Sequence, residues 1–275
     1  MASRRPLVNV SGSIRELPTG DTLPGVRELL TAARTYYVRT DGSDSNDGLS
    51  NSSVGAFATI QKAIDVVGGL DAGIFAITIS VGAGTFAGLL LKDPLGAGSV
   101  TIQGAGATQT ILETTSTHTI NTGLSRKYQL IGFRVQNSGG IARGLFCGPG
   151  SSVIINGLDF GACAAYHIDC SGGIVTAASY SISGGALIHW YAANGGAIVC
   201  AGYTVTLTGS PNFSSAFAAC DIAAFLRVNT NTFAGIATGK RYTVANGGVI
   251  YVAGAGESYL PGNSAGTVGV GGQYA

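Results

Sequence analysis

Two carboxylates near the middle of the sequence are the residues whose type and spacing come nearest to a known chemistry. Asp169 and Asp221 lie 52 positions apart, and enzymes that cleave glycosidic bonds use a pair of carboxyl groups. If the chain coils with a repeat of about half that distance, both carboxyl groups lie on one face, roughly 10 Å apart. That separation is at or beyond the wide limit for such pairs, and no Lys or Arg lies between them to accept a proton. We therefore expect isolated turn or surface aspartates, with a catalytic pair as the alternative.

The segment His189-Trp190-Tyr191 contains the single tryptophan of the chain. Aromatic rings stack on the C–H faces of sugars, so these three side chains are candidates for contact with a glycan. Successive side chains of a strand point to opposite faces, and at least one of the three must therefore point inward. Packing in the core or between subunits is the alternative that we favour.

The Asp-rich loop Asp41–Gly48 is the best candidate for a metal site. A calcium-binding EF-hand loop has a carboxylate at its twelfth position, but this position is Ser52 when counted from Asp41 and Gly55 when counted from Asp44. Side chains that hydrogen-bond to the backbone of a tight turn are the favoured role. The three histidines stand alone in the sequence and no CxxC motif occurs. We therefore expect no metal and no cofactor.

The composition is typical of an all-β chain with many tight bends. Of the 275 residues, 44 are glycine, and 45% are hydrophobic against 11% charged. No uninterrupted apolar run is long enough to predict a transmembrane helix or a signal peptide. A net charge of +1 without a basic block argues against nucleic acid as a partner. Five cysteines without a CxxC pair are typical of reduced thiols in the core of a protein that folds in a reducing cytoplasm.

Strand-like runs recur from residue 74 at a mean interval of about 24 residues, which is within the range of repeat proteins. One apolar residue chosen from each run gives Ile79, Ile102, Ile131, Ile154, Ile174, Ile198, Phe225 and Ile250. Glycine pairs also recur before an apolar residue, at Gly172-Gly173, Gly195-Gly196 and Gly247-Gly248. Coils of this length with no helical pattern between them predict a parallel β-solenoid.

One amphipathic helix is predicted ahead of these coils. Thr59 is a suitable N-cap, and Gly68-Gly69 marks the end of the helix. Between them, apolar residues form one stripe at the spacing i, i+3, i+4 and i+7, namely Ile60, Ala63, Ile64 and Val67. A single short helix is marginally stable in water, so we expect this stripe to cover the open end of the solenoid and to prevent edge-to-edge growth.

The stretch YYVRTDGSDSNDGLSNSSVGAFATIQKAID, from Tyr36 to Asp65, resembles the start of pectate-lyase-like right-handed β-helices in the tail spikes and tail fibres of tailed bacteriophages. The segment RPLVNVSGSIRELPTGDTLPG, from Arg5 to Gly25, is similar to the head segment of phage tail-fibre proteins. The segment YLPGNSAGTVGVGGQYA, from Tyr259 to Ala275, is similar to their closing segment. The resemblance implies a right-handed parallel β-helix, and a parallel homotrimer as the assembly.

We divide the chain accordingly into an attachment segment (1–35), a first strand, loop and capping helix (36–73), the β-helix (74–254) and a closing segment (255–275). The attachment segment includes a short predicted helix over Val26–Arg34 and is too small to have a substantial core. We expect it to dock on other particle proteins. The apolar and proline residues proposed for this contact are Pro6, Leu7, Val8, Leu17 and Leu23.

No Lys, Arg, Asp or Glu occurs between Asp169 and Asp221. A monomeric solenoid normally carries charges on its outer faces, so this stretch predicts an outer face that is covered by another chain. The sequence itself argues only for some oligomer.

Taken with these features, the resemblance implies a non-enzymatic virion protein of a tailed phage. It would be a tail fibre or short tail-spike component, assembled in the host cytoplasm, that contacts a host surface glycan without inserting into the membrane. One alternative is a β-helix depolymerase that cleaves capsule or O-antigen. Another is a collar or head fibre with a purely structural role.

Overall fold

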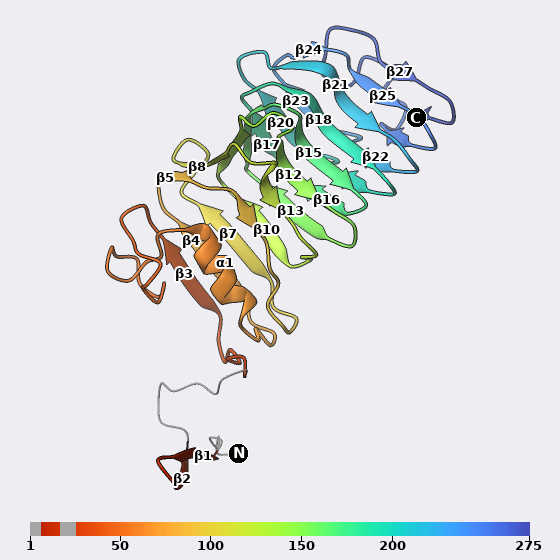
Figure 1. The fold of residues 1–275 in the computed structure, drawn as a ribbon. Helices are drawn as coiled ribbons and strands as arrows, with labels where there is room; N and C mark the ends of the chain where they lie inside the picture. The colour runs from red at the N-terminus through yellow and green to blue at the C-terminus, as the bar shows by residue number, and fades with distance from the viewer. Residues whose placement is uncertain (1–6, 17–25) are drawn as a thin grey trace.

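The computed structural model describes residues 7–16 and 26–275 of the chain. From residue 34 onward the chain forms a parallel β-helix of about eight coils. In Figure 1 the coils stack from β3 and α1 at one end to β27 and the C-terminus at the other. Separately, β1 (Leu7–Val10) and β2 (Ser13–Glu16) form an antiparallel hairpin.

The β-helix has three faces, and each face is a parallel sheet with one strand from each successive coil. The ten-stranded sheet consists of β3 (Arg34–Val38), β4 (Ile77–Val81), β7 (Val100–Gly104), β10 (Tyr128–Ile131), β13 (Ser152–Asn156), β16 (Ile174–Ala177), β19 (Ala197–Val199), β22 (Phe225–Arg227), β26 (Val249–Tyr251) and β28 (Gln273–Tyr274). The seven-stranded sheet consists of β5 (Gly84–Phe86), β8 (Thr110–Thr114), β11 (Arg134–Asn137), β14 (Asp159–Cys163), β17 (Tyr180–Ile182), β20 (Thr204–Leu207) and β23 (Thr232–Ala234). The nine-stranded sheet consists of β6 (Leu89–Leu90), β9 (His118–Asn121), β12 (Arg143–Cys147), β15 (Tyr166–Ser171), β18 (Ala186–Ala193), β21 (Asn212–Cys220), β25 (Tyr242–Val244), β27 (Thr267–Val268) and, beside β21, β24 (Thr238–Gly239).

The predicted repeat of apolar residues is confirmed, and the structure shows which of the eight chosen side chains point inward. All eight chosen residues lie in the ten-stranded sheet. Ile79, Ile102, Ile198 and Ile250 point into the core, whereas Ile131, Ile154, Ile174 and Phe225 lie on the outer face. The buried ladder runs through Ile77, Val100, Tyr128, Val153, Val175, Ile198, Leu226 and Ile250. Several of these strands carry apolar residues on both faces, so alternation alone does not identify the inner one.

The predicted helix is confirmed as α1 (Ile60–Gly68), and its apolar stripe is buried. The side chain of Thr59 accepts a hydrogen bond from the backbone N–H of Lys62, and Gly69 follows as the C-cap. The helix packs against β3, β4 and β6, which belong to the first coils. It therefore covers the end of the β-helix at which the chain begins to coil (Figure 1).

The helix predicted over Val26–Arg34 is wrong. These residues lie along the first coil instead, because the backbone N–H of Leu30 donates to the carbonyl of Asp71 and Leu29 forms a bridge with the same residue. The side chain of Leu30 is buried in the core. Pairing with a distant segment thus overrides the local helical pattern, and β3 begins at Arg34.

The glycine pairs mark the corners at which a new coil enters the ten-stranded sheet. The first glycine of each pair has a positive φ, for example +73° at Gly195, which only glycine adopts at low cost. The second lies against the preceding coil, because a Cβ at Gly196 would lie 2.0 Å from the carbonyl oxygen of Cys170. A fourth pair, Gly271-Gly272, has the same geometry ahead of β28.

The C-terminal segment packs against the last coils. The hydroxyl of Tyr259 donates to the carbonyl of Val228, and Leu260 is buried. The strands β27 and β28 extend two of the three sheets by only two residues each, and short edge strands offer little backbone for further pairing. Among the described residues, no helix has the length and apolar character needed to span a membrane.

Candidate functional site

The outer face of the nine-stranded sheet contains a buried ion pair. Asp169 on β15 has only 1% of its side chain exposed, and its Oδ2 lies 2.5 Å from Nε of Arg143 on β12. The hydroxyl of Ser171 donates to the other carboxylate oxygen over 2.6 Å. Burial raises the pKa of Asp169, while Ser171 and Arg143 oppose this shift. The sequence predicted Asp169 as an isolated aspartate, but it is paired with a cation from the preceding coil.

Four aromatic rings surround this ion pair. The guanidinium carbon of Arg143 lies 5.3 Å from the ring centre of Phe146 and 5.8 Å from that of Tyr166. Phe146 stacks on His118 with ring centres 4.7 Å apart, and Tyr166 stacks on Tyr191 at 4.8 Å. We call these five residues the outer stack. It extends over β9, β12, β15 and β18, because equivalent positions of parallel strands lie about 4.8 Å apart.

The outer stack is rigid, polar at its edges and accessible. Each of its five side chains is partly exposed, and each cation or ring is held by its neighbours. Burial, assisted by the charge of Arg143, lowers the pKa of His118, so this ring is neutral at pH 7. Aromatic edges next to a guanidinium and hydroxyl groups provide apolar contact and hydrogen bonds together, which suits a sugar.

Asp221 does not form a close pair with Asp169. Asp169 pairs with Tyr191 on the next coil, and Tyr191 pairs with Ala219 on the coil after that. The position equivalent to Asp169 on β21 is therefore Ala219, and Asp221 lies two residues beyond it. Its Oδ1 accepts a hydrogen bond from the amide of Asn246 over 2.7 Å. Both carboxylates contribute to raising the pKa of Tyr191, after burial and the neighbouring Tyr166. Both acids therefore lie close enough to Tyr191 to oppose the ionisation of its hydroxyl.

The aromatic triplet is divided between core and surface. His189 and Trp190 are fully buried, whereas Tyr191 is half-buried in the outer stack. Nε2 of His189 lies 2.6 Å from the hydroxyl of Tyr180, and its Nδ1 lies 3.0 Å from Nδ1 of His167. Burial lowers the pKa of His167 to about 4. This arrangement favours the packing role for His189 and Trp190, and leaves Tyr191 as the member that can contact a ligand.

The Asp-rich loop holds the start of α1. Oδ1 of Asp44 accepts from the backbone N–H groups of Ala58 and Thr59, and Oδ2 accepts from the Thr59 hydroxyl. Oδ1 of Asp47 accepts from the N–H of Leu49 in an Asx turn. Within residues 7–16 and 26–275, no cluster of three or more His, Cys, Asp or Glu side chains is arranged to hold a metal ion.

All five cysteines are buried and free, at Cys147, Cys163, Cys170, Cys200 and Cys220.

Two of the residues proposed for attachment lie in the hairpin. Leu7 is 68% exposed and Val8 is half-buried. Of the other residues proposed for attachment, Pro6, Leu17 and Leu23 lie outside the described residues.

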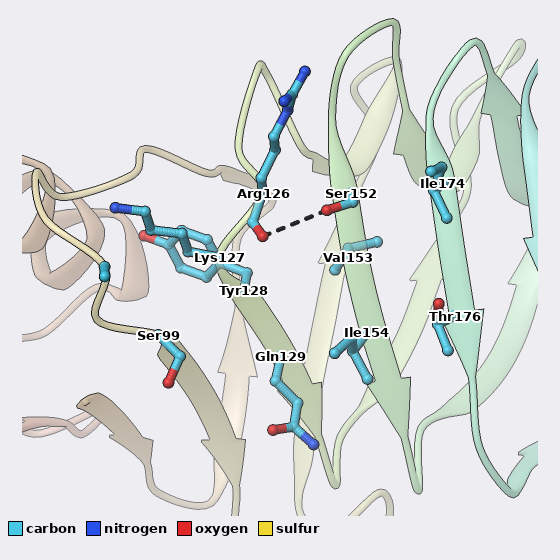
Figure 2. Close-up of a pocket in the computed structure, with 11 residues that line it drawn as sticks. Ser99, Arg126, Lys127, Tyr128, Gln129, Ser152, Val153, Ile154, Ile174 and Thr176 are labelled. Atoms are coloured by element: carbon cyan, nitrogen blue, oxygen red, sulfur yellow. Dashed lines mark hydrogen bonds between the residues drawn. The ribbon is translucent and has the colours of Figure 1, made fainter. Parts of the chain in front are cut away.

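An apolar stripe follows the outer face of the ten-stranded sheet. Ile154, Ile174, Phe225 and Tyr251 are each between 39% and 51% exposed, on β13, β16, β22 and β26. We call these four residues the apolar stripe. A pocket of about 480 Å³ lies at its start and is lined by Ile154, Ile174, Gln129 and Thr176, among others. Figure 2 shows these side chains.

Sequence reasoning missed most of the outer stack, although a signal was present. His118, Arg143 and Tyr166 are separated by 25 and 23 residues, which is the coil repeat, and they are direct rung partners. A search for polar and aromatic residues at this interval would have aligned them.

The chain gives no match to protein-family models, to curated proteins or to solved structures.

Proposed function

We propose that this chain is a non-enzymatic attachment protein of a tailed-phage particle, a tail fibre or short tail-spike component that contacts a host surface glycan through the outer stack. The outer stack is the observation that carries the proposal. It is a preorganised group of aromatic and charged side chains on a rigid rod, and preorganisation reduces the entropy lost on binding. The sequence resemblance to phage tail proteins supplies the biological setting.

Self-assembly is the second part of the proposal. The apolar stripe occupies two rung lines of one face, with Ile154 and Tyr251 in one and Ile174 and Phe225 in the other. Exposed apolar side chains gathered on one face are typical of protein contacts, and the stripe adjoins the part of the chain without charges. A parallel homotrimer would cover the stripe with sister copies and leave the outer stack free on another face. Three copies of a weak glycan site would then bind with avidity. The hairpin β1–β2 would attach the assembly to other particle proteins.

Binding of purified protein to host cells tests the glycan contact. The variant Tyr191→Ala is expected to lower adsorption at least tenfold, because it removes one of the partly exposed aromatic rings of the outer stack. Tyr203→Ala is the matched control, since Tyr203 is 44% exposed and lies outside the outer stack. Equal adsorption by both variants and the unmodified protein would contradict the proposed contact.

A depolymerase is the second candidate, and one observation favours it. Asp169 has a raised pKa, as a general acid requires, and both it and Asp221 lie close to Tyr191. Against this role, the carboxyl group of Asp169 is buried in an ion pair. Incubating the protein with host polysaccharide and measuring reducing ends decides between the two. Release of reducing ends that is lost in Asp169→Asn would establish the enzyme.

The position of this chain in the particle distinguishes a role in host attachment from a purely structural role. Labelling intact particles with antibody against this chain should mark the tail. Label on the collar or head would favour a structural fibre.

A further inference from the structure

A second pocket lies at the end of the β-helix opposite α1. The strand β23 is the last of the seven-stranded sheet, and no strand pairs with its outer edge among the described residues. Residues 258–263 fold back near this edge and form one side of an open pocket of about 580 Å³. This volume is within the range that small-molecule sites occupy. Figure 1 shows β23 and β24 close to the C-terminal end of the rod.

Aromatic and aliphatic side chains form part of the wall. Phe233 and Tyr259 meet edge to face with ring centres 5.4 Å apart. The hydroxyl of Tyr259 is bound to the carbonyl of Val228 over 2.9 Å, which fixes the ring. Ile236 also lines the pocket and is 69% exposed. Such a wall offers apolar contact to the C–H face of a sugar ring.

Arg241 is the one charged residue that lines the pocket. Its Nη1 donates to the carbonyl of Ser264 over 3.2 Å, while its buried Nε has no hydrogen-bond partner among the described residues. A carboxylate is the group that matches the Nη donors of a guanidinium and its positive charge. The charge of Arg241 in the wall of the pocket therefore points to an anionic ligand.

Polar groups beside Arg241 match the hydroxyl groups of a sugar. Asn263 is held by the N–H of Gly239, which donates to its Oδ1 over 2.8 Å. The hydroxyl of Thr238 donates to Oδ1 of Asn212 over 2.9 Å, and its oxygen can still accept. Both Thr238 and Asn263 line the pocket.

We infer that this pocket binds a carboxylate-bearing sugar, with the carboxylate on Arg241 and the ring against Phe233 and Tyr259. The site is separate from the outer stack, and the inference does not depend on the proposed attachment role. The ligand class is an acidic monosaccharide or the corresponding unit of an acidic glycan.

Calorimetric titration of the full chain with methyl β-D-glucuronide and methyl β-D-glucoside tests the inference, because the two probes differ only in carboxylate against hydroxymethyl. The glucuronide should bind at least tenfold more tightly, and its affinity should fall with added salt. Arg241→Gln should remove this preference, and Arg241→Lys should retain part of it. Arg227→Gln, which changes an exposed arginine on β22 outside the pocket, should leave it unchanged.

Three outcomes would overturn the inference. They are equal affinity for the two glycosides, no binding of the glucuronide at millimolar concentration, and unchanged binding in Arg241→Gln. Sodium acetate serves as a further probe, and competition by acetate at the same concentration as the glucuronide would show that the sugar ring is not recognised. Circular dichroism of each variant verifies that the β-helix is intact. If Arg241→Gln fails to fold, the preference for the glucuronide is compared between Arg241→Lys and the unmodified protein instead. Adsorption to host cells is measured separately with Tyr191→Ala, so failure here leaves the attachment proposal to its own test.

Discussion

At the scale of single residues, the ion pair of Asp169 and Arg143 shows how the β-helix tolerates a charge that is almost fully buried. The carboxylate is enclosed by neighbouring rungs, and its cation comes from the preceding coil. Removing one partner of a buried pair leaves an uncompensated charge in the protein. The resulting loss of stability is larger than the net stabilisation that the intact pair provides.

We expect Arg143→Ala to lower the free energy of unfolding by about 3 kcal/mol at pH 7. Without Arg143, only the hydrogen bond from Ser171 opposes the effect of burial on Asp169, so its pKa in the folded state rises further above the unfolded value. A raised pKa gives stability that is present at low pH and lost as the pH rises through it. The difference between variant and unmodified protein in urea unfolding should therefore be smaller at pH 4 than at pH 7. A difference that grows toward low pH would contradict this explanation.

The buried histidines predict the opposite dependence on pH. Burial lowers the pKa of His167 to about 4 and that of His189 well below its ordinary value, in the second case with help from His167. A lowered pKa gives stability that is present above about 6.5 and is lost as the pH falls toward the folded value. For His167 alone this loss amounts to about 3 kcal/mol. Urea unfolding of the unmodified protein at pH 7 and pH 4.5 measures it, and His167→Gln should weaken the dependence. Equal stability of the unmodified protein at both pH values would contradict the prediction.

At the scale of elements, the helix and the coil repeat were predictable because both are local patterns. Thr59, the buried apolar residues of α1 and Gly69 follow general rules for how a helix starts, packs and ends. The outward register of Ile154 and Ile174 was not predictable, since their strands also carry apolar residues at neighbouring positions and the sheet decides which side is inner.

The glycine corners give a prediction at this scale. Gly196→Ala should lower the free energy of unfolding by more than about 2 kcal/mol, because the new Cβ would lie 2.0 Å from the carbonyl oxygen of Cys170. Gly140→Ala is the matched control, since no heavy atom lies within 4 Å of the corresponding Cβ. Chemical denaturation of the two variants compares them directly. Equal stability would mean that close approach of the coils is not what requires glycine at this corner.

At the scale of the whole molecule, the apolar stripe and the outer stack lie on different sheets, the ten-stranded and the nine-stranded. A rod with separate faces can assemble through one and bind through the other. This separation makes the two parts of the proposed function independently testable.

Self-assembly predicts that the mass in solution is three times that of the 27.6 kDa chain. Ile174→Glu should lower the mass to that of the monomer, because three carboxylates would be buried in the contact. Ile141→Glu is the matched control, since Ile141 is 73% exposed and lies outside the apolar stripe. Light scattering after size exclusion measures all three proteins. A monomer in the unmodified protein would remove the assigned role of the stripe.

The all-β class, the repeat of about 24 residues and the capping helix could be predicted from the residues alone, because hydrophobic periodicity, glycine and capping residues act over a few positions or one coil. Which side chains meet across coils became known only from the folded chain. His118, Arg143 and Tyr166 are more than 20 positions apart in sequence, yet they are direct neighbours. The pairing of Arg143 with Asp169 and the burial of Trp190 beside a half-buried Tyr191 were decided in the same way. The physical reason is that stacking places equivalent positions of successive coils about 4.8 Å apart, and a shift of one residue would turn each side chain to the other face.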